Sequence, residues 1–299
     1  MSIYSQINKN RWRTYLIFGL FILLTCGFFY IVGKTVDSGN SYLLIGIVFS
    51  ITSTFGSYFF SDKIVLFSTG AQPADKKRFF DYYTVAENLS IASGIAMPKL
   101  YFIEDPAPNA FATGRNAKHA VICVTTGLLS KLNRAEIEGV VAHELSHIKN
   151  YDILLMSVVA VLVGTIALVS DWMTRRFLWG SFRGRDDNDR GSNPVFFIIA
   201  IVALIISPLI ATIIQLAISR KREFLADADA SLMTRYPEGL ARALERISQD
   251  NSQLKSASTA TAHLFISSPF REKKTANWLA NLFSTHPPIE ERVRILRSM

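Results

Sequence analysis

The chain has 299 residues, of which 49% are hydrophobic, and its mean hydropathy is +0.24. This composition excludes a disordered chain, because such chains have too few apolar residues to form a core. The formal net charge is +8, and many cationic residues flank apolar runs instead of forming a basic block with aromatic residues. That pattern favours contact with a lipid bilayer and predicts no nucleic-acid partner.

Four stretches carry no charged residue and are long enough to cross a bilayer, which takes roughly 18 to 20 residues. They are residues 14–33, 38–61, 153–170 and 191–219. The first is expected to be an uncleaved anchor and not a signal peptide, since it has no clear cleavage site and a second apolar run follows at once. A buried helical hairpin inside a globular domain is the alternative for the third and fourth runs.

Shorter elements are expected between and after these runs. The pattern predicts a helix over 79–92, strands over 98–103, 110–113 and 120–125, and a helix that begins at Asn133 with Glu136 completing a capping box. Residues 220–249 are expected to be helical. Residues 250–276 show no clear element, and a short helix follows Pro287-Pro288. The sequence therefore predicts a membrane α-helical protein with about four transmembrane helices and a small α+β domain.

The distribution of Lys and Arg predicts the orientation in the membrane. Three cations precede the first run and four lie within residues 63–78, whereas the loop between the first two runs holds only Lys34. The amino terminus, the polar segment and the carboxyl-terminal portion are therefore expected in the cytoplasm. Residues 171–193 do not fit this orientation, because it would place their five arginines outside the cell, where the rule predicts few Lys and Arg residues.

The sequence His143-Glu144-Leu145-Ser146-His147 has the pattern H-E-x-x-H on a predicted helix. Residues four apart lie on the same face of a helix, so both imidazoles can hold one Zn²⁺. Glu144 lies beside them and can act as the general base without binding the metal. The alternative is a surface helix with two unrelated histidines.

A catalytic zinc needs a third protein ligand, and His119, His263, His286 and several carboxylates are candidates. The third and fourth apolar runs form a hairpin, so its two ends return to one face of the membrane. Glu223 follows that hairpin within about 6 Å of helix and is brought near the histidines. Asp227 lies on the same helical face as Glu223 and is suited to accept the outward N–H of a ligating histidine.

These residues resemble the motifs of the HtpX family of membrane-bound zinc metalloproteases, which is related to the CAAX prenyl proteases. The matching segments are His143 to His147, Glu223 to Asp227, Asn109 to Gly114, and Thr285-His286-Pro287-Pro288. The likeness covers nearly the whole chain. It implies one Zn²⁺ per chain, held by His143, His147 and Glu223, with Glu144 as catalytic base and Asp227 supporting a ligand.

The resemblance also implies how substrates bind. The strand that contains Asn109, Ala110 and Phe111 would lie at the edge of the cleft, where an extended peptide can pair with it. His286 would lie near the metal and stabilise the oxyanion or gate the site; a plain turn residue is the alternative. The implied role is cleavage of misfolded or damaged membrane proteins under stress, at the cytoplasmic face of the cell membrane.

The expected organisation has four parts: two transmembrane helices over 1–61, a cytoplasmic catalytic portion over 62–152, a transmembrane hairpin over 153–219, and a cytoplasmic helical portion over 220–299. Two other functions compete with an endopeptidase. A non-catalytic, metal-stabilised membrane scaffold or chaperone would need no base at Glu144. A transporter would need ionisable residues within its spans, and the four apolar runs contain none.

Overall fold

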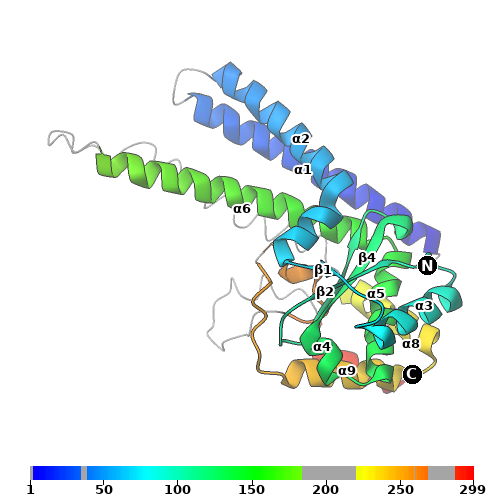
Figure 1. The fold of residues 1–299 in the computed structure, drawn as a ribbon. Coiled ribbons are helices and arrows are strands. Elements are labelled where there is room, and N and C mark those ends of the chain that lie inside the picture. Colours follow the sequence, from blue (N-terminus) through cyan, green and yellow to red (C-terminus); the bar gives the residue numbers. More distant parts are fainter. Residues whose placement is uncertain (1–2, 35–38, 184–219, 259, 269–286) are drawn as a thin grey trace.

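The structure is a computed structural model that describes residues 3–34, 39–183, 220–258, 260–268 and 287–299. Long helices extend from a body in which helices pack around a small sheet (Figure 1). The described carboxyl-terminal end lies at the side of the body far from the helical hairpin (Figure 1). This arrangement agrees with the expected combination of membrane helices and a small α+β domain.

Two helices, α1 (Ile3–Lys34) and α2 (Gly39–Thr69), form the hairpin. Each contains a stretch long and apolar enough to cross a membrane, Asn10–Ile31 and Gly39–Thr69, and only 17% of each stretch is buried. Exposed apolar side chains on helices of this length suit lipid, because every backbone group is satisfied within the helix. The first two apolar runs are thus confirmed as helices that qualify as spans.

The third apolar run lies in α6 (Asp152–Arg183). Its first part qualifies as a span only together with α5 (Arg134–Lys149), and the two are bent by 86°. Residues 152–163 are buried, several of them against Ile17 and Phe21 of α1. The fourth run lies outside the described residues, so the expected four spans are represented here by two helices, or three with the bent pair.

The sheet has the strand order β1-β2-β4-β3. Strand β2 (Lys99–Ile103) runs parallel to β4 (Ala120–Thr125), while β1 (Gln72–Pro73) and β3 (Ala110–Gly114) pair antiparallel to their neighbours. The three strands expected from the sequence are confirmed, and β1 is additional. Strand β3 lies at one end of this order, so its other edge has no strand partner among the described residues.

Helix α5 forms the centre of the body. Its start has the expected capping box, in which Asn133 and Glu136 exchange side-chain and backbone hydrogen bonds. Every residue from Gly139 to Ile148 is buried. A Cβ atom on Gly139 would lie 2.6 Å from the backbone nitrogen of Leu240, so this glycine permits close contact with the neighbouring helix.

The helices around α5 are α3 (Phe80–Ser93), α8 (Arg220–Thr234), α9 (Pro237–Gln249) and α11 (Ile289–Leu296), with α4 (Thr126–Lys131) beside the sheet. Residues 220–249 are helical as expected, but they form two helices. The chain breaks at Arg235, which has a φ of 53°, and Pro237 begins the next helix. Short 3-10 turns occur at Ala117–His119 and Ala262–Leu264.

Candidate metal centre

Two histidines of α5 and one glutamate of α8 converge inside the body. The Nε2 atoms of His143 and His147 are 3.2 Å apart. The carboxylate of Glu223 lies 3.8 Å from Nε2 of His143 and 3.5 Å from Nε2 of His147. All three side chains are buried. The start of α8 and the end of α5 thus meet, as expected if the chain between them returns to the same face of the membrane.

The other ring nitrogen of each histidine faces a carboxylate. Nδ1 of His143 lies 3.0 Å from Oδ1 of Asp227, and Nδ1 of His147 lies 3.0 Å from Oδ2 of Asp152. A carboxylate accepts a hydrogen bond from a protonated Nδ1, and the lone pair of Nε2 is then free to bind a metal ion. Both histidines are therefore oriented with their Nε2 lone pairs toward Glu223.

This donor set fits a metal ion. The two Nε2 atoms, 3.2 Å apart, are close enough to share one proton or to bind one metal ion between them. Ligands that surround one zinc tetrahedrally at about 2.0–2.1 Å lie roughly 3.3–3.4 Å from one another, close to the separations found here. Among the described residues, His143, His147 and Glu223 form a group whose ligand atoms all lie within 4.8 Å of one another.

Arg292 of α11 supports the His143 side of the centre. It is fully buried, and its Nε and Nη2 atoms donate to both oxygens of Asp227, at 2.9 and 2.7 Å. Its Nη1 atom donates to the backbone carbonyl of Ile266. Burial alone would raise the pKa of Asp227, but the charge of Arg292 and the hydrogen bonds outweigh it and lower that pKa. Asp227 is thereby held as an acceptor for His143.

Asp152 supports the His147 side through a different set of residues. Its second oxygen, Oδ1, accepts hydrogen bonds from Arg222 of α8 at 3.0 Å and from Asn10 of α1 at 2.8 Å. Burial alone would lower the pKa of His147, but the hydrogen bond to Asp152 and the charge of Glu223 raise it to about 9. The cluster therefore attracts positive charge at this position.

Glu144 lies between the metal ligands in sequence and next to β3 in space. It is buried, and the backbone of Ala112 forms a hydrogen bond with it. Burial and the nearby charge of Glu223 raise the pKa of Glu144 to about 7. A carboxyl group with such a pKa both takes up and releases a proton near neutral pH.

Comparison with known proteins gives this centre its context. Residues 77–299 match Peptidase family M48. The chain belongs to this family. It is 43% identical to a "Protease HtpX homolog" from Caldanaerobacter subterraneus subsp. tengcongensis, with 100% of this chain and 98% of that protein covered. It is 44% identical to a relative of the same name from Thermoanaerobacter pseudethanolicus, with the same coverage.

A solved structure, S. mikatae Ste24p, is also similar. It has 19% sequence identity and a TM-score of 0.49, with 94% of this chain covered. The chain spans 63% of the length of that solved protein. The M48 family and the full-length relatives confirm the resemblance to HtpX proteases and make this chain a membrane metallopeptidase.

The remaining residues expected at the site of this M48 peptidase lie at different places. The backbone oxygen of Ala110 accepts a hydrogen bond from Ile266, and the side chain of Asn109 contacts the backbone of Ser267. Phe111 is buried against Phe265. The outer edge of β3 is thus occupied at Ala110, and it faces Glu144 at Ala112.

Two other candidate histidines lie within the described residues, and neither joins the centre. His263 contacts the backbone oxygen of Met156 at 3.0 Å, and His119 contacts Arg115 and Asn116 near the surface. His286 lies outside the described residues. The sequence predicted that Asp227 supports a ligating histidine, but it did not predict the roles of Asp152 and Arg292.

Proposed function

We propose that the chain is an integral-membrane, zinc-dependent endopeptidase that cleaves misfolded or damaged membrane proteins on the cytoplasmic side of the cell membrane. The observation that carries the proposal is the convergence of His143, His147 and Glu223 in a buried cluster, with Glu144 beside it. Membership of family M48 and the HtpX relatives support the same reaction class.

His143, His147 and Glu223 would hold one Zn²⁺ per chain through two imidazole nitrogens and a carboxylate. When bound, zinc acts as a Lewis acid on a carbonyl and lowers the pKa of water toward neutrality. Asp227 and Asp152 keep the Nδ1 protons of the two histidines in place, and Arg292 keeps Asp227 charged. His143 and His147 therefore present their Nε2 atoms without rearrangement.

Glu144 acts as the general base. Its carboxylate takes a proton from the attacking water and later gives it to the amine that leaves the peptide bond. A pKa of about 7 suits both steps, because the group exchanges a proton readily at neutral pH. By resemblance, His286 would stabilise the oxyanion or gate the site.

The substrate is an extended polypeptide that lies beside β3. Ala110 and Phe111 belong to this strand, and Asn109 directly precedes it. Ile266 is already bonded to Ala110, and the N–H of Ala112 bonds Glu144, so pairing with a peptide would be concentrated at the backbone oxygen of Ala112. The closeness of Ala112 to Glu144 supports this position, because a paired peptide would have its backbone near the base.

The proposed organisation places two transmembrane helices in residues 1–61 and a cytoplasmic catalytic portion in 62–152. A transmembrane hairpin follows in 153–219, and residues 220–299 carry the third ligand. The distribution of Lys and Arg supports a cytoplasmic site in a multi-pass plasma-membrane protein. A site next to the bilayer would meet the cytoplasmic segments of membrane proteins first, and that position supports a role in quality control under stress.

The test measures zinc content and casein cleavage on the same detergent-purified samples. Wild type is expected to hold about one zinc per chain and to cleave. Glu144→Gln should keep zinc and lose cleavage, whereas Glu223→Ala should lose both. Glu290→Ala, on an exposed glutamate of α11, is the matched control and should behave as wild type.

Full cleavage by Glu144→Gln would refute the assignment of the base. Zinc retained by Glu223→Ala would place the third ligand elsewhere, with His286 the next candidate. Bound zinc without cleavage in wild type would favour a scaffold or chaperone.

A further inference from the structure

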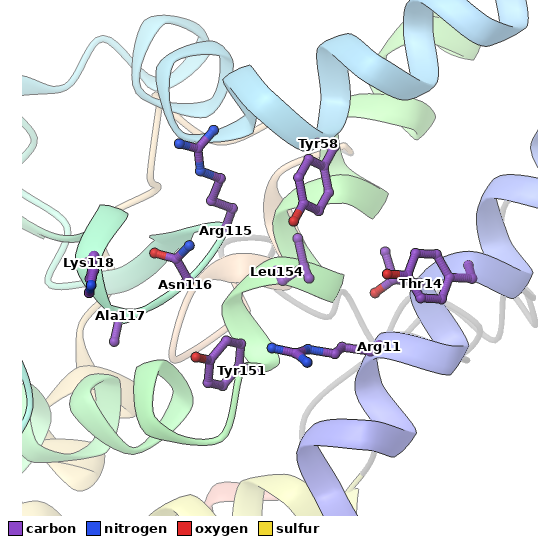
Figure 2. A pocket seen from close by; sticks show the side chains of 10 residues that line it. Arg11, Thr14, Tyr58, Arg115, Asn116, Ala117, Lys118, Tyr151 and Leu154 are labelled. Carbon is purple, nitrogen blue, oxygen red and sulfur yellow. The ribbon is translucent and has the colours of Figure 1, made fainter.

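A polar cavity lies where α1 and α2 meet the body, and the proposed protease mechanism does not use it. Its volume is about 610 Å³, within the size range of small-molecule sites. Residues from α1, α2, the segment after β3 and the start of α6 surround it (Figure 2). Its polar lining includes Arg11, Thr14, Tyr58, Arg115, Lys118 and Tyr151.

The charge of this lining has one sign. Arg11, Arg115 and Lys118 contribute three cations, and the lining contains no carboxylate. Arg11 lies over the ring of Tyr151 at 5.4 Å, and Arg115 lies over Phe59 at 5.5 Å and contacts His119. Within the described part of the chain, none of the three cations forms an ion pair. Three like charges around one cavity favour the binding of an anion.

The cavity also offers uncharged hydrogen-bond donors. Figure 2 shows the side chain of Arg11 directed toward Tyr151, and the hydroxyl of Tyr58 directed toward Leu154. The side chain of Asn116 and the hydroxyls of Thr14 and Tyr151 belong to the same lining. Guanidinium groups bind phosphate through two parallel hydrogen bonds, so this set of donors suits a phosphate group.

The position of the cavity indicates a lipid as the source of that phosphate. Arg11 and Thr14 lie in the first turns of the apolar stretch Asn10–Ile31. Trp12 and Tyr15 in the same turns are 74% and 61% exposed, as is typical of aromatic residues at a membrane surface. Exposed Leu16 and Phe59 lie next to lining residues and provide an apolar surface for acyl chains.

We propose that this cavity binds the headgroup phosphate of an anionic phospholipid. Arg11 and Arg115 would grip the phosphate oxygens, Lys118 would add charge, and the acyl chains would lie along α1 and α2. Arg115 directly follows β3, so a bound lipid would connect the end of that strand to the first membrane helix. A basic pocket between membrane helices on the cytoplasmic side is a typical site for such headgroups.

The test is native mass spectrometry of the full chain after incubation with mixed micelles that contain equal amounts of phosphatidylglycerol and phosphatidylcholine. Wild type is expected to retain phosphatidylglycerol preferentially. The variant Arg11→Gln/Arg115→Gln/Lys118→Gln should reduce that retention by at least about tenfold, since each cation at a membrane surface contributes substantially to binding. The control variant Lys77→Gln/Lys99→Gln/Arg294→Gln removes the same charge from exposed positions elsewhere and should retain lipid as wild type does.

Several results would overturn the proposal: equal retention of both lipids by wild type, no loss in the cavity variant, or equal loss in the control variant. Inorganic phosphate that displaces the lipid at equal concentration would identify a free-phosphate site instead. An acidic peptide that displaces it would identify a peptide site. If the triple variant does not fold, single substitutions of Arg11 and Lys118, both exposed, give the same comparison. The readout is lipid retention, so its result is independent of protease activity.

Discussion

Oδ2 of Asp152 lies 3.0 Å from Nδ1 of His147, and Oδ1 of the same carboxylate accepts hydrogen bonds from Asn10 and Arg222. One side chain therefore connects the candidate metal centre to the first membrane helix. The contact depends on the bend after α5, where Tyr151 has a φ of 59°. That bend directs Asp152 back toward the histidine.

Asp152→Asn is expected to weaken zinc binding by about 10- to 100-fold, because the amide is a poorer acceptor for the Nδ1 proton of His147. Competition with a chelator at fixed pH measures the change in affinity. The matched control is Asp229→Asn. Asp229 accepts hydrogen bonds from Ser146 and Asn150, and its substitution should leave zinc affinity close to that of wild type. Equal zinc affinity in all three proteins would contradict a supporting role for Asp152.

Arg292→Leu is expected to destabilise the fold strongly. Asp227 would keep its charge in a buried position without its partner, and the loss of one member of a buried ion pair costs about 3–5 kcal/mol. The thermal unfolding midpoint in detergent should fall markedly. Arg292→Lys keeps the charge but not the two parallel hydrogen bonds, so its unfolding midpoint should lie between those of wild type and Arg292→Leu.

The control for Arg292 is Arg297→Gln, which removes exposed ion pairs with Glu238 and Glu245. Solvent screens these pairs, so the unfolding midpoint should change far less. Similar midpoints for Arg292→Leu and Arg297→Gln would show that burial of the Arg292–Asp227 pair does not contribute to stability.

The stability of the metal-free protein should depend on pH through Glu144. Folding raises the pKa of this carboxyl from its ordinary value of 4.5 to about 7. The protonated form thus favours the folded state, and this contribution is full below pH 4.5 and lost as the pH rises through about 7. Glu144→Gln does not titrate, so it should become more stable than wild type over this interval, by up to about 3 kcal/mol.

Unfolding midpoints of both proteins, measured in a chelator between pH 4 and 8.5, give the difference directly. Titrating groups that do not interact with Glu144 are common to both proteins and cancel, whereas His147 interacts with Glu144 and contributes to the difference. Two parallel curves would mean that the pKa of Glu144 is the same in the folded and unfolded states.

Gly139→Ala should destabilise the body by about 1–3 kcal/mol, the usual cost of overpacking. The new Cβ would lie 2.6 Å from the backbone nitrogen and 2.8 Å from the Cα of Leu240, and neither atom can move without shifting α9. Gly19→Ala, in α1, meets no atom within 4 Å and serves as the control. If both variants unfold at the wild-type temperature, α5 and α9 are not in close contact at Gly139.

Local patterns in the sequence predicted much of the site. The capping box at Asn133 and the spacing of His143 and His147 are properties of one helix. Glu223 was inferred from connectivity alone, on the expectation that the third and fourth apolar runs form a hairpin whose two ends meet. Each of these inferences uses neighbours in sequence or the return of the chain across a membrane.

Other features depend on long-range contacts or on unusual backbone angles, and sequence patterns do not contain them. Arg292 contacts Asp227 across 65 positions, and a charged residue four places after Pro288 looks like an ordinary surface arginine. Asp152 faces His147 only because Tyr151 adopts a left-handed conformation, which is uncommon for a residue with a Cβ atom. Pro237 is the residue in the sequence that indicates the break between α8 and α9. Apolar residues continue on both sides of it, so the apolar pattern alone does not indicate the break.

The hydrogen bonds that Asn10 donates to Asp152 and to the backbone of Asn150 have a practical consequence for the preparation of soluble fragments. A fragment that begins after α2 would lack the two apolar helices and dissolve more readily, but it would also lack Asn10. The amide group of Asn10 bonds both Asp152 and the backbone oxygen of Asn150, so its removal exposes the carboxylate next to His147 to solvent. Low zinc occupancy in such a fragment would then reflect the cut and not the native enzyme.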